Sequence, residues 1–426
     1  MTADTIFALS SGSPPAAIAV VRISGARAEE ALRRLAGKLP PPRTAQVATL
    51  RASSGEPLDR AILLRFVAPA SATGEGLVEL HLHGGRAVVA AVLRELEAID
   101  GLREAEPGEF TRRAFENGRI DLAEAEGLAD LLEAETESQR RSALALAQGS
   151  LSRAVAGWQD RLLQLGAQLE AVIDFSDEGE VGEGLPARWS DDLADLRREL
   201  ESALARPPAE RLREGLRTVI AGPPNAGKSS LLNWLAGRDA AITSAVAGTT
   251  RDLVEAPTSI GGTPFLLVDT AGLRDGRDEV EAIGIERARR SLAEADLILW
   301  LGRPQDCPEP GRSLVVQSKI DTDERDPAAQ YHVSAETGEG MADLVAGIIE
   351  RAAGLLPRNG DVALNRRHRD AIADAVKSLR DAGSNSDIIL VAEAVKAARS
   401  ALGRVTGGGG VEDMLDALFG RFCLGK

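Results

Sequence analysis

The stretch GPPNAGKS, residues 222–229, decides the fold of the central part of the chain. It fits the pattern Gly-x-x-x-x-Gly-Lys-Ser, with an apolar run (residues 218–221) before it and an amphipathic, leucine-rich run after it. A strand, a glycine-rich loop and a helix in this order are typical of a loop whose backbone N–H groups hold phosphate oxygens. We therefore predict that Lys228 neutralises the β and γ phosphates of a nucleotide and that Ser229 binds Mg²⁺. The loop residues expected to contact the nucleotide are Asn225, Ala226, Gly227, Lys228, Ser229 and Ser230.

Two other stretches predict the rest of the phosphate and metal site. An apolar run leads into DTAG, residues 269–272, where Asp269 is expected to support the Mg²⁺ shell and Gly272 to contact the γ-phosphate. Upstream, GTTRD at residues 248–252 offers Thr250 as a second hydroxyl ligand for Mg²⁺, on a loop that the γ-phosphate would order. The nucleotide contacts predicted in these stretches are Thr249, Thr250, Asp269, Thr270, Ala271 and Gly272.

The sequence also indicates which base the nucleotide carries. SKID, residues 318–321, follows an apolar run at the place where a base-recognising Asn-Lys-x-Asp is expected. The Asp321 carboxylate can accept hydrogen bonds from guanine N1–H and the 2-amino group, whereas adenine N1 is an acceptor, so GTP is favoured over ATP. Ser318 replaces the usual Asn, and we expect the loss of that amide to remove contacts between the base loop and the phosphate loop and to weaken affinity. The contacts predicted here are Ser318, Lys319, Asp321, Ser334, Ala335 and Glu336.

Composition favours a multidomain cytoplasmic protein. The 426 residues, 44% of them apolar, leave room for about two or three domains with real cores. The 65 acidic and 50 basic residues give a net charge of −15, so RNA contact is expected to be local or made through a partner. The two cysteines, Cys307 and Cys423, give no disulfide framework. No apolar run is long enough for a membrane span, and the start lacks a secretory signal pattern.

The short apolar runs and turn residues of the segment 1–118 predict a small α+β unit. Residues 77–82 alternate, with Glu79 and His81 on one side and apolar residues on the other, which is typical of a half-buried strand; a helical pattern follows. In such a strand a glutamate is more often solvated than a ligand. His81 and His83 lack a third ligand nearby, so we favour a surface and turn role for them over a metal site.

Amphipathic helical patterns flank the nucleotide-binding segment on both sides. Residues 119–212 and 357–426 carry apolar residues at spacings of three and four, yet neither part is expected to fold alone. The simplest interpretation is one all-α helical domain split by an inserted α/β GTPase, residues 213–356, with a last helix over residues 411–419. The predicted apolar faces are Leu122, Ala125, Ala129 and Leu132; Trp158, Leu162, Leu165, Leu169 and Val172; Leu193, Leu196, Leu200 and Leu204; Ile372, Val376 and Leu379; and Ile388, Val391, Val395, Ala398 and Leu402.

The order of motifs resembles that of the MnmE (TrmE) family of tRNA-modification GTPases, and the resemblance spans the whole chain. Its most specific part is the terminal Phe-Cys-x-Gly-Lys pattern, which generic GTPases lack. The stretches that carry the resemblance are DTI (4–6), RISG (22–25), GEGLVELHLHGG (74–85), PGEFT (107–111), AF (114–115), NG (117–118), DLA (121–123), the inserted Ras-like GTPase, and FCLGK (422–426).

This resemblance implies a tRNA-modifying function. The N-terminal domain is expected to bind tetrahydrofolate and to form a homodimer, and the helical domain to supply a functional cysteine, Cys423. With an FAD-containing partner, MnmG (GidA), such proteins build an aminomethyl or carboxymethylaminomethyl group on C5 of the wobble uridine of certain tRNAs. The one-carbon unit would come from 5,10-methylene- or 5-formyl-tetrahydrofolate, and tRNA would be bound mainly through the partner. The positions matching the folate contacts are Arg22, Glu79, Arg119 and Lys426.

The resemblance also implies how GTP is hydrolysed. Leu273 follows DTAG, where Ras-like enzymes place a water-orienting Gln. In the family, a Glu reached when GTPase domains pair helps to position water, and Glu281 is the matching position. No arginine finger is assigned, and K⁺ near the β and γ phosphates is expected to replace its charge. The positions matching the K⁺ site are Asn225, Ser244, Val246 and Thr249, of which Ser244 is also an expected GTP contact; the expected catalytic residues are Lys228, Glu281 and Cys423.

Two alternatives stand beside this interpretation. The chain could be a GTPase switch of ribosome assembly, close to Era or Der, although it has one GTPase segment and no evident basic RNA-binding face. Alternatively, the N-terminal unit could serve only as a dimerisation scaffold. Binding of folate would distinguish the first interpretation from both alternatives.

Overall fold

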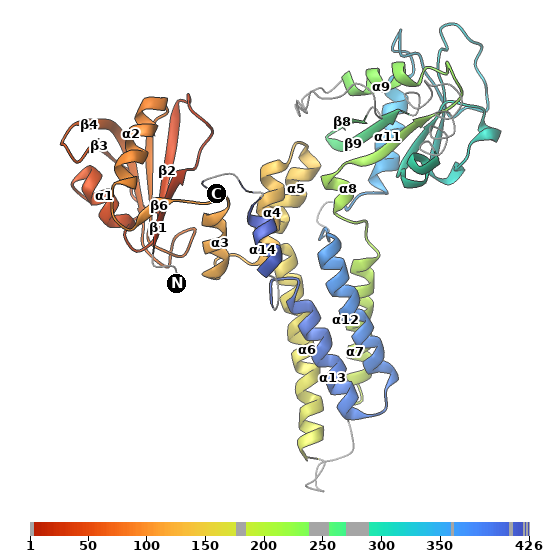
Figure 1. Ribbon diagram of the computed structural model, residues 1–426. Helices are drawn as coiled ribbons and strands as arrows, with labels where there is room; N and C mark the ends of the chain where they lie inside the picture. Colours follow the sequence, from red (N-terminus) through yellow and green to blue (C-terminus); the bar gives the residue numbers. More distant parts are fainter. Residues whose placement is uncertain are drawn as a thin grey trace, which may run out of the picture. The chain divides into compact units, whose positions relative to one another are not determined.

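The computed structural model (Figure 1) describes residues 4–175, 185–237, 255–269, 289–358, 362–408, 412–420, 422 and 425. The chain divides into two compact units. One unit joins Met1–Ala129 with Thr406–Lys426, and the other is Asp130–Val405. The end of the chain therefore belongs to the N-terminal unit, although the whole second unit separates the two segments in sequence.

A six-stranded sheet forms the centre of the N-terminal unit, in the order β3-β4-β5-β2-β1-β6. Every pairing is antiparallel except that of β1 with β6. The strand predicted at residues 77–82 is confirmed as β5, with Val78, Leu80 and Leu82 buried on one face. The strands are β1 (Thr5–Leu9), β2 (Ile18–Ser24), β3 (Gln46–Arg51), β4 (Pro57–Phe66), β5 (Leu77–His83) and β6 (Leu102–Glu104).

Two helices, α1 (Ala28–Ala36) and α2 (Arg86–Glu97), cover one face of this sheet. Together with the inward side chains of the strands they bury the main core of the unit. On the other face, Ile18 is 57%, Val47 51% and Ile62 42% exposed. Because side chains alternate along a strand, the residues between these positions point into the core while this set stays outside. The sheet thus has one covered face, and its other face is buried around Ile6 and Ala8 of β1 but open towards β3 and β4.

The helix predicted over residues 411–419 is confirmed as α14 (Glu412–Phe419). It packs against the first half of α4 (Leu122–Glu133). Leu132, predicted on the apolar face of α4, is 44% exposed, so that prediction is wrong: the residue lies beyond the turns that α14 covers. The buried cluster between the two helices is Leu122, Ala125, Ala129, Leu418, Phe419 and Phe422.

The helix α3 (Glu109–Glu116) lies against α14 in the same unit. Gly108, which precedes α3, has a φ of 72°, and a Cβ added to it would lie 2.2 Å from the carbonyl oxygen of Phe419. This close approach of two backbones requires glycine. Arg112 of α3 lies over the ring of Phe419, with 5.4 Å between its guanidinium carbon and the ring centroid.

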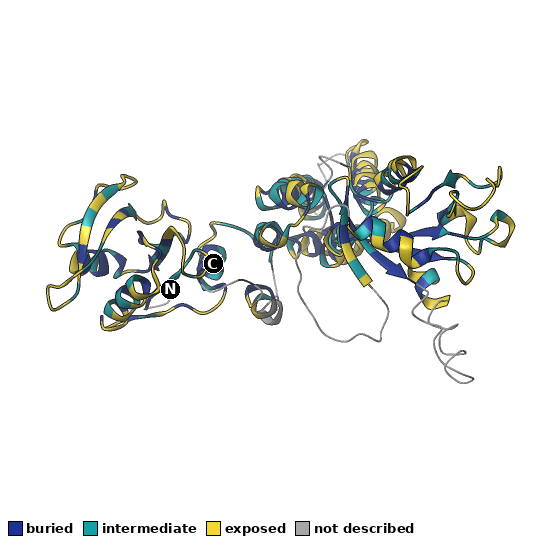
Figure 2. Cartoon of the chain, turned by 90° about the horizontal axis from the view of Figure 1, so that it is seen from above, coloured by how far each residue is buried: buried dark blue, intermediate teal, exposed yellow. Residues whose placement is uncertain are grey.

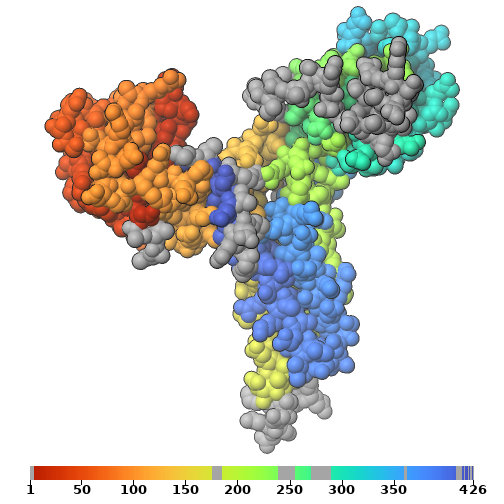
Figure 3. Space-filling model, in the orientation of Figure 1, coloured from red at the N-terminus to blue at the C-terminus, as the bar shows by residue number. Residues whose placement is uncertain are grey.

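Four helices of the second unit form a bundle, two from each side of the inserted segment (Figure 1). α13 packs on α6 and α12, and α7 packs on α6 and α12. Figure 3 shows the blue surface of α12 and α13 beside the yellow surface of α6. The predicted apolar faces are confirmed, with Val172, Leu204 and Ile388 only half-buried at the edges. The helices are α5 (Glu137–Ala147), which precedes the bundle, α6 (Ser150–Phe175), α7 (Trp189–Leu204), α12 (Arg366–Ser384) and α13 (Ile388–Gly403).

Arginines in the first turn of α12 tie the bundle together where the inserted segment leaves and returns. Basic residues at a helix N-terminus oppose the helix dipole. Here they donate instead to carbonyls at the ends of other helices: Arg367 to Arg404 (2.6 Å) and Val405 (2.9 Å), and Arg369 to Leu204 (2.7 Å). Cationic side chains stabilise unpaired carbonyls at helix C-termini. The two halves of the helical domain are thus joined independently of the insertion.

The inserted segment forms a second six-stranded sheet, in the order β12-β11-β10-β7-β9-β8. All neighbouring strands are parallel except the hairpin of β8 and β9. The apolar runs that precede GPPNAGKS, DTAG and SKID form the strands β7, β9 and β11. The strands are β7 (Leu216–Ala221), β8 (Glu255–Ile260), β9 (Thr263–Asp269), β10 (Leu297–Trp300), β11 (Ser313–Gln317) and β12 (Tyr331–His332).

Both faces of this second sheet are buried, and dark blue dominates its strands in Figure 2. α8 (Glu210–Arg213), α9 (Lys228–Gly237) and α11 (Met341–Ala353) cover one face, and residues around Leu292 cover the other. This is the α/β architecture predicted from the phosphate loop. Two short helices between β10 and β11 complete the segment, η2 (Pro304–Asp306) and η3 (Pro310–Arg312).

Candidate functional site

The phosphate loop lies between β7 and α9, which confirms the predicted strand, loop and helix order. Gly222 (φ 153°), Asn225 (φ 61°) and Gly227 (φ 83°) have positive φ values. A Cβ on Gly222 would lie 2.9 Å from the carbonyl of Leu301, so the loop can pass this neighbouring backbone only with glycine. The loop ends at the N-terminus of α9, and the N–H groups of a helix N-terminus favour anions.

Lys228, the first residue of α9, is only 8% exposed. Its Nζ donates hydrogen bonds to the carbonyl oxygens of Gly222 (3.1 Å) and Pro223 (2.9 Å). The side chain therefore folds back across the loop, and the ammonium charge is held against the loop backbone. A charge fixed at this place can neutralise the phosphates of a nucleotide bound by the loop.

Two oxygen donors lie together beside the loop. Ser229 Oγ donates a 2.7 Å hydrogen bond to Oδ2 of Asp269, which is 4% exposed. Asp269 ends β9, the parallel neighbour of β7, so both residues lie at the same edge of the sheet. A hydroxyl and a carboxylate at hydrogen-bond distance are oxygen ligands of the kind that Mg²⁺ prefers.

The base loop is tied to the phosphate loop in spite of the missing asparagine. Ser318 Oγ donates a 2.5 Å hydrogen bond to the carbonyl oxygen of Ala226, and Lys319 Nζ donates a 2.7 Å bond to that of Asn225. The expectation that the serine weakens this connection is therefore corrected in part. A hydroxyl is shorter than an amide, but the loops approach closely enough for it to reach, with 3.4 Å between Ser318 Oγ and a Cβ placed on Gly227.

The remaining base-loop residues follow β11 and β12, which are parallel neighbours and so end at the same edge of the sheet. Asp321 is exposed and its carboxylate is accessible to a base. Ser334 is fully buried, and its Oγ accepts a hydrogen bond from the N–H of Thr337 (3.2 Å). Ala335 is half-buried, and Glu336 is exposed, as is Ser230 on α9. The structure thus brings the described part of the predicted GTP site to one edge of the sheet.

Ten predicted site residues lie outside the residues that the structure describes, and their roles stay predictions. They are Ser244, Val246, Thr249, Thr250, Thr270, Ala271, Gly272, Glu281, Cys423 and Lys426.

Two of the four predicted folate contacts meet on the open face of the N-terminal sheet. Arg22 on β2 is the direct cross-strand partner of Glu79 on β5. Arg22 Nη2 and Nε donate to Glu79 Oε1 at 2.9 and 3.2 Å, and the two side chains are 25% and 16% exposed. The guanidinium also lies 5.8 Å from the ring centroid of Phe110. The result is a paired cation and anion, half-buried and accessible from one side.

A third predicted contact, Arg119, is exposed in the same unit. Its side chain passes Gly74, where an added Cβ would lie 3.2 Å from Arg119 Cγ. Gly74 has a φ of 79° and opens the GEGLVELHLHGG motif. Next to it, Asn117 Nδ2 donates a 2.8 Å hydrogen bond to the carbonyl oxygen of Thr73. Because Gly74 has no side chain, the aliphatic part of Arg119 fits beside it.

Sequence reasoning missed a buried ion network in this unit. Arg113, 2% exposed, donates to Asp4 Oδ1 (3.0 Å), Glu75 Oε2 (3.1 Å) and Glu109 Oε1 (3.2 Å). Arg103 also pairs with Asp4 and Glu109. The three acidic residues belong to three motifs, DTI, GEGLVELHLHGG and PGEFT. The presence of an acidic residue in each motif was the only sign in the sequence that they share a basic partner. Nothing local in the sequence shows that one arginine joins them.

The network lowers the pKa of two acidic residues, Asp4 and Glu109. Burial alone would raise the pKa of the Asp4 carboxyl, but the hydrogen bond from Arg103 and the charges of Arg103 and Arg113 outweigh burial and lower it. Burial likewise opposes ionisation of Glu109, and Arg103 together with the N–H of Glu106 reverses its effect, so the pKa is lowered. Both carboxylates are therefore held in the charged form.

The two histidines of β5 contact different carboxylates. His81 Nε2 lies 3.3 Å from Glu79 Oε2, and His83 Nδ1 lies 2.7 Å from Asp59 Oδ1. The side chain of His83 is 74% exposed, as expected for a turn residue, whereas that of His81 is 27% exposed. The predicted surface role therefore fits His81 only in part, because its side chain is half-buried and contacts Glu79. Among the residues that the structure describes, no group of three His, Cys, Asp or Glu side chains could hold a metal ion.

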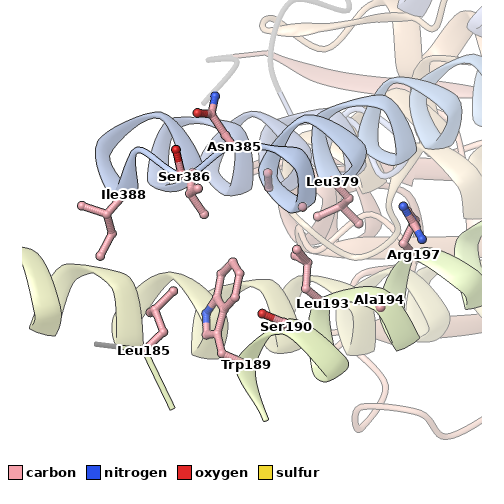
Figure 4. Close-up of a pocket in the computed structure, with 13 residues that line it drawn as sticks. Leu185, Trp189, Ser190, Leu193, Ala194, Arg197, Leu379, Asn385, Ser386 and Ile388 are labelled. Atoms are coloured by element: carbon pink, nitrogen blue, oxygen red, sulfur yellow. The ribbon is translucent and has the colours of Figure 1, made fainter. Parts of the chain in front are cut away.

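A cavity of about 390 Å³ lies in the helical bundle (Figure 4). Trp189 and Leu193 of α7 face Leu379 of α12 and Ile388 of α13 across it, with Arg197 at one end. None of the predicted site residues lines this cavity. No helix within the described ranges has the length and apolar character needed to cross a membrane.

The chain resembles known proteins along nearly its full length. Residues 5–119 match the family model for the GTP-binding protein TrmE N-terminus, and residues 122–423 match that for the MnmE helical domain. The chain is 54% identical over 424 residues to the tRNA modification GTPase MnmE of Erythrobacter litoralis (strain HTCC2594), covering 99% of this chain and 100% of the relative. It is 56% identical over 429 residues to the protein of the same name from Rhizorhabdus wittichii, covering 99% and 97%. Among solved structures, the G domain of the T. maritima FeoB iron transporter covers 32% of this chain and 98% of that chain, with 21% identity and a TM-score of 0.24.

Proposed function

The chain belongs to the MnmE family of tRNA modification GTPases, and we propose that it couples GTP hydrolysis to addition of an aminomethyl or carboxymethylaminomethyl group to C5 of the wobble uridine in certain tRNAs. One observation supports this proposal most. The same chain holds a phosphate loop and, in its other unit, an Arg22–Glu79 pair at positions matching folate contacts. We assign folate binding and dimerisation to residues 1–118, GTP hydrolysis to 213–356, and the helical domain to 119–212 with 357–426.

Within the GTPase, Lys228 and Asp321 have the clearest roles. The ammonium of Lys228 lies against the phosphate loop, where it would neutralise the β and γ phosphates. The exposed Asp321 carboxylate would accept hydrogen bonds from guanine. The bonds from Ser318 and Lys319 to the phosphate loop would keep the base site and the phosphate site in a fixed relation.

The oxygen donors beside the phosphate loop fit Mg²⁺. Ser229 Oγ lies 2.7 Å from Asp269 Oδ2, and we propose Ser229 and Thr250 as direct ligands, with Asp269 supporting the shell. When bound with the nucleotide, Mg²⁺ would neutralise negative charge that develops on the β and γ phosphates. Asp269 would hold the Ser229 hydroxyl in the orientation that binding requires.

For hydrolysis we propose a K⁺-dependent mechanism in which two GTPase domains pair. Asn225 is exposed on the phosphate loop and could offer a side-chain oxygen to K⁺, together with Ser244, Val246 and Thr249. Leu273 cannot orient water as a glutamine does, and Glu281 is proposed to take that role. Turnover should be much faster in KCl than in NaCl, and Glu281→Ala should slow hydrolysis while GTP affinity changes little. Equal rates in the two salts would exclude the K⁺ role.

The open face of the N-terminal sheet supports the folate proposal. A reduced pterin presents adjacent N–H groups, and a carboxylate such as Glu79 can accept a hydrogen bond from them. Its glutamate tail can be bound by cationic side chains such as Arg119 and Lys426. Arg22 holds the Glu79 carboxylate in place from the neighbouring strand. Bound 5,10-methylene- or 5-formyl-tetrahydrofolate would supply the one-carbon unit.

The same face supports a homodimer. Ile18, Val47 and Ile62 are exposed there, on the side of the sheet that carries Arg22 and Glu79. Exposed apolar residues gathered on one sheet face favour contact with another protein surface. We propose that a second copy of the chain covers part of this face.

A partner protein completes the proposed reaction. The net charge of −15 disfavours binding of tRNA over the general surface, so we propose that tRNA is bound mainly through an FAD-containing MnmG (GidA) partner. Cys423 is proposed to act in the modification itself. The reaction would take place in the cytoplasm, where tRNAs are available.

Two measurements test the function as a whole. Calorimetry with 5-formyl-tetrahydrofolate should show binding to the full-length protein, and mass spectrometry of tRNA should show the wobble-uridine modification only in cells that carry the gene. If the protein binds and hydrolyses GTP but the modification is unchanged without the gene, a switch of the Era or Der type becomes the better assignment.

A further inference from the structure

The Glu79 carboxylate has a second neighbour besides Arg22. His81 lies two residues further along β5, and therefore on the same face of the sheet. Its Nε2 is 3.3 Å from Glu79 Oε2, whereas Nε and Nη2 of Arg22 both donate to Oε1. A carboxylate only accepts hydrogen bonds, so Nε2 carries the proton in this contact. The two oxygens are thus held by two different side chains.

This division matters because the last torsion of a glutamate side chain is loosely restrained by itself. Arg22 alone holds one oxygen, and the carboxylate plane could still turn about it. The contact of His81 with Oε2 removes that freedom. With Arg22 on Oε1 and His81 on Oε2, the carboxylate keeps one accepting site on Oε2 in a fixed direction for a pterin N–H, and less conformational entropy is lost when the ligand binds.

The imidazole of His81 is itself held by its neighbours. The strand register places Val20 of β2 directly opposite His81 on one side and Ile62 of β4 on the other. Side chains directly opposite one another in a sheet lie in contact distance, and both neighbours are β-branched and stiff. The ring, 27% exposed, thus has an apolar residue opposite it on each neighbouring strand, and its Nε2 lies 3.3 Å from Glu79 Oε2.

We propose that His81 is a positioning residue of the folate site, which holds the Glu79 carboxylate in the plane that binds a reduced pterin. This inference rests on the folate-binding function proposed above. His81 need not touch the ligand, and it acts through Oε2 of Glu79. The neighbouring His83 has no such role, because its partner is Asp59.

A matched pair of variants tests this role. His81→Gln places an amide N–H near the position of Nε2, whereas the shorter His81→Asn cannot reach Glu79. Calorimetry with 5-formyl-tetrahydrofolate on the full-length protein should show affinity about fivefold to tenfold weaker for His81→Asn and close to wild type for His81→Gln. His83→Asn, on the same strand, should bind as the wild type does. Thermal unfolding of each variant checks that the N-terminal unit remains folded.

The outcomes separate the two proposals. If the wild-type protein does not bind the folate, the proposed function fails before His81 is tested. If it binds and His81→Asn binds equally well, or if Gln fails to restore the affinity that Asn loses, the positioning role is wrong. The chain has four histidines, so their imidazole signals can be assigned in a ¹³C-histidine NMR spectrum. Added folate should shift the His81 signal and leave those of His332 and His368 in place.

Discussion

The described part of the chain contains two six-stranded sheets that differ in what covers them. In the GTPase segment the strands are mostly parallel, and both faces are buried. In the N-terminal unit the strands are mostly antiparallel, helices cover one face, and the other keeps Ile18, Val47 and Ile62 exposed. Parallel strands need crossover helices, which bury both faces, whereas antiparallel hairpins do not.

The difference decides where each sheet can bind a ligand. A sheet covered on both faces leaves its carboxyl edge available, and there Lys228, Ser229, Asp269 and Ser318 gather. An open face offers the side chains of neighbouring strands instead, and there Arg22 pairs with Glu79. We therefore expect the two sites to respond independently to substitutions made directly at either one.

The largest effect is expected at the edge of the parallel sheet. Lys228→Ala removes the charge held against the phosphate loop, and GTP hydrolysis should fall by about two to three orders of magnitude, as for other groups that stabilise a transition-state charge. Folate affinity, measured by calorimetry, should stay unchanged. Lys377→Ala on the exposed surface of α12 is a matched control. If Lys228→Ala also loses folate binding, the two sites do not respond independently.

The next effect is expected on the open face. Glu79→Gln keeps the shape of the side chain but leaves Arg22 without its counter-charge, and folate affinity should fall about tenfold to a hundredfold, as for hydrogen bonds to charged groups. The rate of GTP hydrolysis should not change. Glu97→Gln, exposed at the end of α2 on the covered side of the sheet, should leave both activities intact. If Glu79→Gln and Glu97→Gln bind folate with equal affinity, Glu79 is not part of the folate site.

A smaller effect is expected where the base loop meets the phosphate loop. Ser318→Ala removes the hydrogen bond to the carbonyl of Ala226, and GDP affinity should fall about threefold to tenfold. The preference for guanine over adenine should persist, because Asp321 is untouched. Titration with fluorescent GDP and ADP analogues measures both quantities, and Asp321→Asn is the contrasting variant that should lose the preference. Unchanged GDP affinity in Ser318→Ala would show that the bond does not contribute.

The smallest effect concerns acid stability, which should differ between the units. Asp4 and Glu109 have lowered pKa values in the folded N-terminal unit. Their contribution to its stability is complete above their unfolded values, near 3.8 and 4.5, and is lost as the pH falls through the lower folded values. Arg103→Ala should lower the stability of the N-terminal unit by about 1 kcal/mol at neutral pH, a modest amount because the pairs are partly exposed. The stability of the variant should therefore depend less on pH.

Hydrogen exchange of peptides from residues 5–104 measures this prediction between pH 3 and 7. All four tryptophans, at positions 158, 189, 234 and 300, lie in the second unit, so their fluorescence serves as an internal control. Exchange in Arg103→Ala should be faster than in the wild type at neutral pH, and the difference should narrow as acid protonates the carboxylates. A change in tryptophan fluorescence with the substitution would contradict the assignment to the N-terminal unit.

Local patterns in the sequence were sufficient for the strand, loop and helix around the phosphate-binding motif and for the main helices of the bundle. The phosphate loop, its strand and its helix are contiguous, and their spacing follows from the chemistry of phosphate binding. The apolar faces of α6, α7, α12 and α13 follow from helical periodicity. The error at Leu132 arose because periodicity shows which residues share a face and does not show where the packing partner ends.

By itself the sequence determined the family, the order of elements and the identity of the nucleotide site. Only the tertiary structure decided that Arg22 meets Glu79 across 57 residues, that Arg113 joins three separate motifs, and that Ser318 still reaches the phosphate loop. The physical reason is the range of the interactions: capping, periodicity and loop geometry act between near neighbours in the chain, whereas strand register and close packing fix contacts between residues far apart in it.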